Sequence, residues 1–251
     1  MAEKHRYSAS QIGMFNRCGK QWEFRYLKNL KIPPGAALTI GKAVDDSVTA
    51  NLQIKIETGE PASLAEALNV SSEAFDKYAL ETEFGDDDPG FCKDQTIQLS
   101  ELHYNEVAPD IQPESVQEEF NIETSEWDIK GFMDVVEVDG KVRDTKTSGK
   151  KKNQNELFKN IQGLTYDWAY QQTHGKKAKS FGLDVLVKNK KPVVQRIETQ
   201  YEPADWNWLF ENIERMDKAI KAGVALPAPE GSWWCNEKWC GYWEICKGKK
   251  S

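Results

Sequence analysis

The stretch Gly131–Lys146, GFMDVVEVDGKVRDTK, constrains the fold more than any other part of the sequence. It predicts two short strands joined at Asp139-Gly140, a dipeptide that is typical of tight hairpin turns. Because side chains alternate along a strand, Asp144 and Lys146 are expected to share one face of the second strand.

The length of the hairpin loop decides where Asp134 points. A two-residue turn would pair Asp134 with Thr145, on the other face, whereas a three-residue loop at 138–140, with Gly140 left-handed, pairs it with Asp144. In that register the two Cβ atoms would lie about 4.5–5.5 Å apart, and the carboxylates could share a divalent ion. We expect the three-residue loop. Scattered charge on a solvent-facing hairpin is the alternative interpretation.

Composition excludes several classes of protein. The 251 residues are enough for a full core, and no run of eighteen apolar residues or apolar signal core is present. We therefore expect a soluble, cytoplasmic protein that does not enter membranes. The net charge of -7 argues against loose coating of polyanions but permits a local basic groove. Lys150, Lys151 and Lys152 follow the hairpin, where a phosphate backbone would pass if the hairpin is the site, whereas the lysines near 176–179 and 188–191 fit solvated loops at least as well.

The order of elements predicts an α/β fold with a mixed central sheet wrapped by helices. Helices are expected over 10–28, from 38–41 past residue 52, over 155–172 and over 204–222, with a helical insertion over 54–115. Three successive strands are expected between 115 and 148, and two more flank the turn at 189–191. Asp45 and Asp46 should then fall on the first turns of the second helix.

Two further patterns suggest sites. Gln162 and Tyr166 are four residues apart, so they share a helix face that could overhang the hairpin or form a polar rim. Near the C-terminus, the spacing Cys235-x4-Cys240-x5-Cys246 gives three thiols, and Cys18 could be the fourth if the termini meet. Four thiolates could hold an iron–sulfur cluster shielded by the neighbouring aromatic residues, or zinc, or they could stay unligated. Cys92 is interpreted as a free thiol.

In this order, the motifs resemble the PD-(D/E)XK nuclease superfamily, and within it RecB-type exonucleases with a four-cysteine 4Fe-4S cluster, such as CRISPR-associated exonucleases. The matching motifs are an N-terminal helix with Cys18, GFMD with Asp134, DTK with Asp144 and Lys146, Q-x-x-x-Y with Gln162 and Tyr166, and the cysteines Cys235, Cys240 and Cys246.

The resemblance implies a single nuclease domain over residues 1–251 with a restriction-endonuclease-like fold. It also implies that a metal bound by Cys18 and residues 235–246 clamps the N- and C-terminal lobe together. It implies Mg²⁺- or Mn²⁺-dependent hydrolysis of DNA, as an exonuclease acting on single strands or ends in repair, recombination or processing. A helicase or recombinase partner is also implied.

The resemblance also implies roles for individual residues. Asp134 and Asp144, with Asp45, would hold the ions. Lys146 would orient or deprotonate the water and offset charge on the phosphate, and Gln162 with Tyr166 would hold the scissile strand.

The sequence departs from the family pattern at two points. Asp45 stands where the family has a histidine four residues after Gly41, and oxygen ligands suit magnesium and manganese. The x4 spacing between Cys235 and Cys240 is longer than the x2 of many relatives. A catalytically silent DNA-binding or scaffold protein on the same fold is the alternative function, and the Asp45 substitution supports it.

Overall fold

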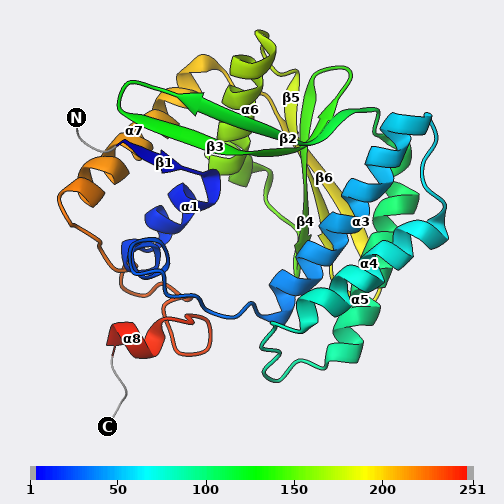
Figure 1. Ribbon diagram of the computed structural model, residues 1–251, viewed down its shortest axis with the longest axis horizontal. Coiled ribbons are helices and arrows are strands. Elements are labelled where there is room, and N and C mark those ends of the chain that lie inside the picture. Colours follow the sequence, from blue (N-terminus) through cyan, green and yellow to red (C-terminus); the bar gives the residue numbers. More distant parts are fainter. Residues whose placement is uncertain (1–3, 248–251) are drawn as a thin grey trace. The chain divides into compact units, whose positions relative to one another are not determined.

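The computed structural model describes residues 4–247, whose ribbon is drawn in Figure 1. These residues form two compact units, which we call the sheet unit (33–120 and 132–202) and the terminal unit (4–32, 121–131 and 203–247). Residues 1–3 and 248–251 of the domain predicted over the whole chain lie outside the described range. None of the helices within residues 4–247 combines the length and the apolar character that crossing a membrane requires.

A mixed sheet forms the centre of the sheet unit. Its strands are β3 (Trp127–Glu137), β4 (Lys141–Ser148), β5 (Ser180–Val187) and β6 (Val193–Thr199), adjacent in that order, with β2 (Pro113–Glu123) paired to β3. β4 and β5 run parallel, whereas β3–β4 and β5–β6 are antiparallel. Every residue of β5 is buried, which agrees with its nearly continuous Leu and Val content. The predicted α/β class with a mixed central sheet is confirmed.

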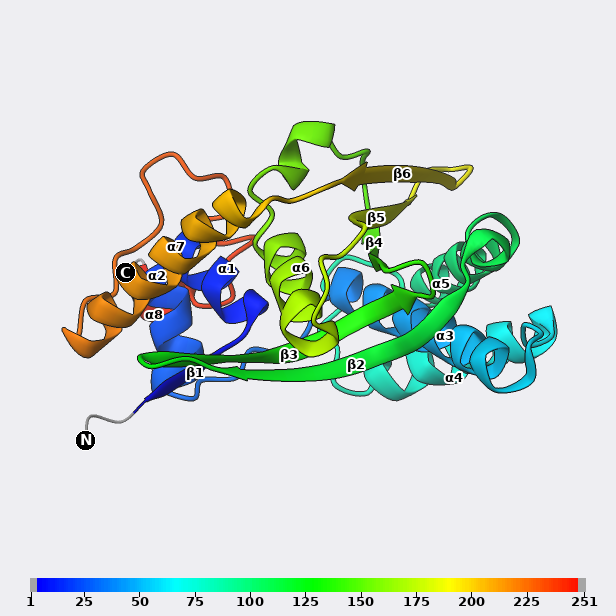
Figure 2. The ribbon, with the colours of Figure 1, turned by 90° about the horizontal axis from the view of Figure 1, so that it is seen from above.

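Helices cover both faces of this sheet. The helices α3 (Ala36–Thr58), α4 (Leu64–Ala79) and α5 (Pro89–Glu106) lie side by side (Figure 1) and share one apolar core with Val135 and Leu186 of the sheet. α6 (Ile161–His174) contacts β4 and β5 (Figure 2), and its Tyr166 hydroxyl reaches Asp134. Because Asp134 and Val135 point to opposite faces, α6 lies on the face away from α3–α5.

The helical region predicted over 54–115 contains α4, α5, the end of α3 and the short helix η2 (Ala108–Asp110). Its helices pack against α3 within the sheet unit. α3 itself begins directly after Gly35, earlier than the sequence predicted. Asp45 and Asp46 therefore lie on its third turn rather than its first turns, too far along the helix for the macrodipole to explain them.

Two predicted helices are interrupted. The helix expected over 10–28 divides into α1 (Ala9–Arg17), α2 (Gly19–Trp22) and the π-helical turn η1 (Glu23–Leu27), because Cys18 has an extended backbone with φ −165° and ψ 104°. The helix expected over 155–172 begins only at Ile161, after the 3₁₀ turn η3 (Gln154–Leu157). There Asn160 starts a new helix, since its side-chain oxygen accepts the Gly163 N–H at 2.8 Å.

The terminal unit is mostly helical. Besides α1, α2 and η1 it contains α7 (Pro203–Lys221), close to the predicted range, and the short α8 (Trp243–Lys247). β1 (His5–Tyr7) pairs in parallel with the first residues of β3, Trp127 to Ile129. The buried Asp217 of α7 accepts hydrogen bonds from Tyr7 and His5, at 2.8 and 2.9 Å, which fixes β1 against α7.

Candidate catalytic site and cysteine pocket

The hairpin of β3 and β4 has the register that the sequence predicted. Val135 pairs with Arg143 and Val136 with Val142, and one further step places Asp134 opposite Asp144. The loop spans residues 138–140, and Gly140 is left-handed with φ +85°. The Asp134 and Asp144 carboxyl groups lie within hydrogen-bonding contact of each other. The three-residue loop is thus confirmed, and the two carboxyl groups meet on one face of the sheet.

Asp144 is the buried centre of this site. Its side chain is fully inaccessible, and its Oδ1 accepts hydrogen bonds from Lys146 Nζ at 2.7 Å and Gln162 Nε2 at 3.0 Å. Its Oδ2 is also buried and has no hydrogen-bond partner within residues 4–247. Burial and the adjacent Asp134 raise the pKa of Asp144 well above its usual range, although Lys146 opposes the shift. An unsatisfied buried carboxylate oxygen favours a bound cation or proton.

α6 supplies two side chains to the site. Tyr166 OH donates to Asp134 Oδ1 at 3.0 Å, and Gln162 Nε2 lies 2.8 Å from the same hydroxyl. Burial, reinforced by the nearby carboxylates, raises the pKa of Tyr166 above its usual range, so its phenol keeps its proton. The i, i+4 spacing of Gln162 and Tyr166 therefore produces the contact with the hairpin that the sequence suggested.

Asp45 approaches the same group of charges from α3. Burial, with a smaller contribution from Asp144, raises the pKa of Asp45 to about 6, and Lys146 opposes the shift. Burial lowers the pKa of Lys146, but Asp144, Asp134 and Asp45 outweigh it and raise that pKa overall. Among residues 4–247, no three His, Cys, Asp or Glu side chains are positioned so that they could hold a metal ion as they stand. Asp45 interacts electrostatically with Asp144 and Lys146.

A surface cavity of about 260 Å³ opens onto these side chains. It is lined by Asp144, Lys146, Thr147, Ser148, Lys152, Glu156, Asn160, Gln162 and Leu183. Of the three lysines predicted to bind DNA, Lys152 lines this cavity, and its Nζ lies 3.3 Å from Glu156, whereas Lys150 and Lys151 are exposed outside its lining. Asn160 and Ser148 were not predicted from the sequence, although Asn160 has the residue type of a helix cap.

Gly163 sets the approach of α6 to the sheet. A Cβ atom at this position would lie 2.6 Å from the Tyr201 hydroxyl oxygen and 2.7 Å from the Phe181 ring. Real Cβ atoms do not approach neighbours so closely, so a larger residue requires the Tyr201 and Phe181 side chains or this turn of α6 to shift. Gln162, which donates to Asp144, is the preceding residue.

Comparison with known proteins agrees with this geometry. The sequence pattern of the PD-(D/E)XK nuclease superfamily matches residues 6–247. The chain belongs to this superfamily. The predicted superfamily is therefore confirmed, and the mixed sheet wrapped by helices is consistent with its restriction-endonuclease-like fold. None of the curated protein sequences matches the chain.

Solved structures include a similar fold. A crystal structure described as a "Putative exonuclease" from Eubacterium rectale has a TM-score of 0.65 and 16% sequence identity, and the match covers 100% of this chain and 90% of that chain. A second structure, described as SSO0001, covers 93% of this chain and 95% of its own at 16% identity, but its TM-score of 0.38 is too low to indicate a shared fold.

A buried charge network lies on the face of the sheet opposite Asp134 and Asp144. Arg143 donates to both oxygens of Asp184, at 2.8 and 2.7 Å, and to Glu137 at 3.2 Å. His103 of α5 is buried in the same region, where burial and the arginines lower its pKa to about 4 against the opposing effect of Asp184. The sequence interpretation missed this network. Asp184, a charged residue within the otherwise apolar strand SFGLDVLV, is the sequence feature that could have revealed the network.

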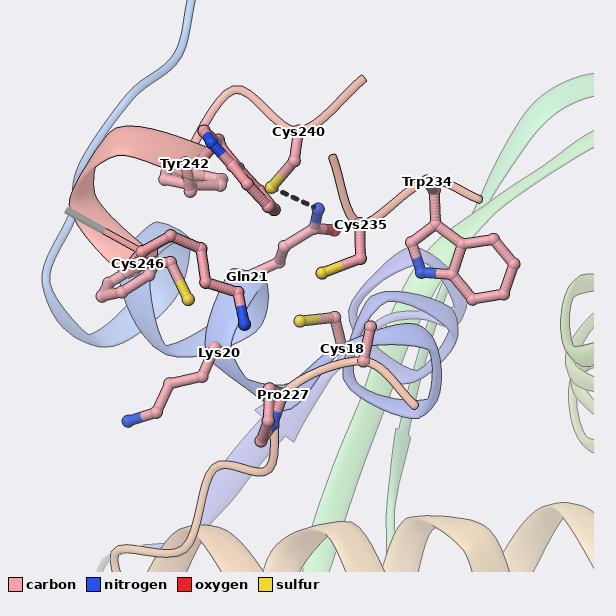
Figure 3. A pocket seen from close by; sticks show the side chains of 13 residues that line it. Cys18, Lys20, Gln21, Pro227, Trp234, Cys235, Cys240, Tyr242 and Cys246 are labelled. Atoms are coloured by element: carbon pink, nitrogen blue, oxygen red, sulfur yellow. Dashed lines mark hydrogen bonds between the residues drawn. The ribbon is translucent and has the colours of Figure 1, made fainter. Parts of the chain in front are cut away.

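Four of the five cysteines meet within the terminal unit. Cys18, Cys235, Cys240 and Cys246 line one pocket, with their sulfur atoms directed into it (Figure 3). Gln21 Nε2 donates to Cys240 Sγ at 3.3 Å, and Trp234, Tyr242 and Trp243 complete much of the apolar lining. Cys92 lies elsewhere, buried in the core of the sheet unit. The predicted gathering of Cys18 with the C-terminal trio is therefore observed.

Proposed function

We propose that this member of the superfamily is a Mg²⁺- or Mn²⁺-dependent deoxyribonuclease that hydrolyses phosphodiester bonds of DNA. The observation that carries the proposal is the contact between Asp134 and Asp144, with a buried Asp144 Oδ2 that has no hydrogen-bond partner among the described residues. Hard divalent cations prefer such oxygen ligands, so the residues fit the metal. Asp134 and Asp144 would hold it, with Asp45 as the third carboxylate.

The other residues of the site have distinct tasks in this proposal. A bound Mg²⁺ or Mn²⁺ supplies Lewis-acid stabilisation of the phosphate oxygens. Lys146 Nζ, already held at 2.7 Å from Asp144 Oδ1, would orient the attacking water and offset charge on the phosphate. Gln162 and Tyr166 keep the two carboxylates in place and would contact the scissile strand.

We propose further that the substrate is DNA with a single strand or a free end, and that the enzyme acts as an exonuclease in DNA repair, recombination or processing. The description of the E. rectale protein as a "Putative exonuclease" supports this choice. Lys150, Lys151 and Lys152 would contact flanking phosphates, and Lys152 is the best placed because it lines the cavity. A helicase or recombinase is the kind of partner proposed, in the cytoplasm.

The test uses labelled single- and double-stranded DNA, with Mg²⁺ or Mn²⁺ and with each end blocked in turn. Asp144→Asn keeps the shape of the side chain but removes the charge, so activity should fall on the order of a thousandfold. Asp76→Asn, an exposed carboxylate paired with Lys93, is the control and should stay active. Equal activity of wild type and Asp144→Asn would refute the catalytic assignment. DNA binding without cleavage by the wild type would instead identify a silent DNA-binding protein.

We also propose that Cys18, Cys235, Cys240 and Cys246 bind a 4Fe-4S cluster, with zinc as the alternative. Four thiols that line one pocket with aromatic neighbours support this proposal. Thiolates around a cluster stand further apart than those around one ion, because the cluster itself is larger. Anaerobic purification followed by metal analysis and visible absorption tests it. Brown protein with stoichiometric iron is expected, and colourless protein with one zinc would reject the cluster.

A further inference from the structure

Gln195 of β6 binds the loop that carries Lys152 to the candidate catalytic site. Its Oε1 accepts the Lys152 N–H at 2.7 Å, and its Nε2 donates to the Lys152 carbonyl oxygen at 2.8 Å. A side-chain amide can donate and accept at once, so Gln195 pairs with the backbone of this residue as a neighbouring strand would. Residues 149–153 form no helix or strand of their own, so these two bonds fix the position of Lys152.

Strand register places Gln195 on the face of the candidate catalytic site. Val185 of β5 pairs with Lys146 of β4 on one side and with Gln195 on the other. Residues directly opposite one another in a sheet point to the same face, and Lys146 shares its face with Asp144. Gln195 is not part of the cavity lining, whereas Lys152 is. Any influence of Gln195 on the cavity therefore passes through Lys152.

The charged end of Lys152 forms an ion pair with another residue of the cavity. Its Nζ lies 3.3 Å from a Glu156 carboxylate oxygen, and the two side chains are 34% and 49% exposed. Exposed ion pairs are weak, so a DNA phosphate that reaches the cavity can take the place of Glu156. The other Glu156 oxygen accepts the Asn153 N–H at 2.8 Å, which ties Glu156 to the loop. Lys152 thus has a fixed backbone and a partner that a phosphate can displace.

We propose that Gln195 is a positioning residue: it fixes the backbone of Lys152 so that the ammonium group contacts a DNA phosphate flanking the scissile bond, in competition with Glu156. The inference rests on the proposed function, because it takes DNA as the substrate. A flanking contact is made equally in the ground state and the transition state, so its loss raises KM and leaves kcat unchanged. The effect of Glu156 has the opposite sign, since removing its charge frees Lys152 for the phosphate.

The first test compares KM and kcat on labelled single-stranded DNA. Gln195→Met keeps the size of the side chain but removes both hydrogen bonds, so KM should rise about fivefold with kcat unchanged. Lys152→Gln should raise KM by a similar factor. In the Lys152→Gln background, Gln195→Met should have no further effect, because no ammonium group is left to position. A residue that merely stabilised the loop would raise KM in both backgrounds.

Two further variants test the competition and the specificity of the anchor. Glu156→Gln should lower KM about twofold, because it removes the competing charge and keeps an acceptor for the Asn153 N–H. Gln154→Met is the matched control: Gln154 Nε2 also reaches β6, where it donates to the Glu198 carbonyl oxygen at 2.7 Å, and its loss should leave KM near the wild-type value.

Affinity in the absence of cleavage provides an independent measurement. Fluorescence anisotropy of the same oligonucleotide in the Asp144→Asn background should show weaker binding when Gln195 is replaced. The dependence of log affinity on log salt should fall by about 0.7, the value for one phosphate contact on a single strand. Thermal melting checks that each variant folds, and Gln195→Thr, with a residue type favoured in strands, removes the same two bonds in a second way.

The inference is wrong if folded Gln195→Met and Gln195→Thr variants keep the wild-type KM, or if Gln195→Met raises KM equally with and without the Lys152 ammonium group. An equal effect of Gln154→Met, or a rise in KM for Glu156→Gln, would also overturn it. Failure of the proposed function is distinguishable. Binding of DNA without cleavage would refute that function alone, and the affinities would still test Gln195. Cleavage with unchanged KM in the Gln195 variants would refute this inference alone.

Discussion

In the sheet unit, the side chains of the candidate catalytic site project from strands and helices, and protein hydrogen bonds hold Asp144 and Tyr166 in place. In the terminal unit, the four cysteines are presented differently. Residues 222–242, which carry Cys235 and Cys240, consist of turns and extended chain without a helix or strand, and Cys18 occupies a break between two helices.

The two sites differ in what holds their side chains in position. Strand register and helix packing position the carboxylates before any ligand binds, which is what precise chemistry requires. Cys235 and Cys240 lie in a segment without a helix or strand, so a group bound between the thiols would supply much of the stability of the segment. Substitutions in the two sites should therefore have different consequences for folding.

The largest effect is expected at the cysteine pocket. Cys240→Ser should prevent binding of the proposed metal or cluster, and with it remove a stabilising contribution on the order of 10 kcal/mol. Metal content should fall and limited proteolysis should cut within residues 222–247, while the sheet unit keeps its melting temperature. Cys92→Ala is the matched control: it should lower the stability of the sheet unit, where Cys92 is buried, and leave metal content unchanged. Unchanged metal content in Cys240→Ser would contradict the proposal that the cysteine pocket binds a metal or cluster.

Lys146→Gln should lower the cleavage rate about 10²- to 10³-fold, the usual cost of removing one group that stabilises transition-state charge. The melting temperature should change little, because the Lys146 side chain is 44% exposed. Lys150→Gln, an exposed lysine outside the cavity lining, should have a much smaller effect. The measurement is the initial rate on labelled DNA, and a large loss of stability in Lys146→Gln would show that the residue is structural.

His103 should make the sheet unit sensitive to acid. Its pKa is lowered from 6.5 to about 4 in the fold, so between these values the unfolded chain binds a proton that the folded chain does not. Stability should therefore rise with pH across this window and fall on acidification, by up to about 3 kcal/mol for this group. Urea unfolding at several pH values measures the slope. His103→Gln should flatten it, and an unchanged slope would contradict the role of the histidine.

The smallest effect is expected at the start of α4. The Ser63 hydroxyl accepts the Glu66 N–H at 3.2 Å, and the Glu66 side chain accepts the Ser63 N–H at 2.8 Å, which completes a capping box. Ser63→Ala should lower the free energy of unfolding by about 1 kcal/mol, without any change in activity. Chemical denaturation of the purified variant provides the measurement. A change in cleavage rate would show that α4 affects the site.

The sequence predicted the hairpin well because its determinants are local. Alternation places Asp144 and Lys146 on one face, and Gly140 selects the loop that brings Asp134 opposite Asp144. Helix periodicity likewise identified Gln162 and Tyr166, since an i, i+4 pair needs no knowledge of the tertiary fold.

Features that the apolar pattern does not record were missed. The break at Cys18 leaves the apolar periodicity intact, so the pattern predicted one continuous helix. α6 begins late because Asn160 caps it. The apolar pattern continues on both sides of Asn160, so it did not indicate that a helix begins there. The contact between Arg143 and Asp184 joins residues 41 apart in sequence, and only the pairing of β4 with β5 brings them together.

Because Gly163 has no Cβ atom, the first turn of α6 can lie close to Tyr201 and Phe181. The separations of 2.6 Å from Tyr201 and 2.7 Å from Phe181 that a Cβ would have mean that even alanine must displace these side chains or the first turn of α6. Gln162, one residue earlier, would move with that turn and leave Asp144 with one donor fewer. Gly163→Ala should thus lower the cleavage rate, although it leaves every polar side chain of the candidate catalytic site in the sequence.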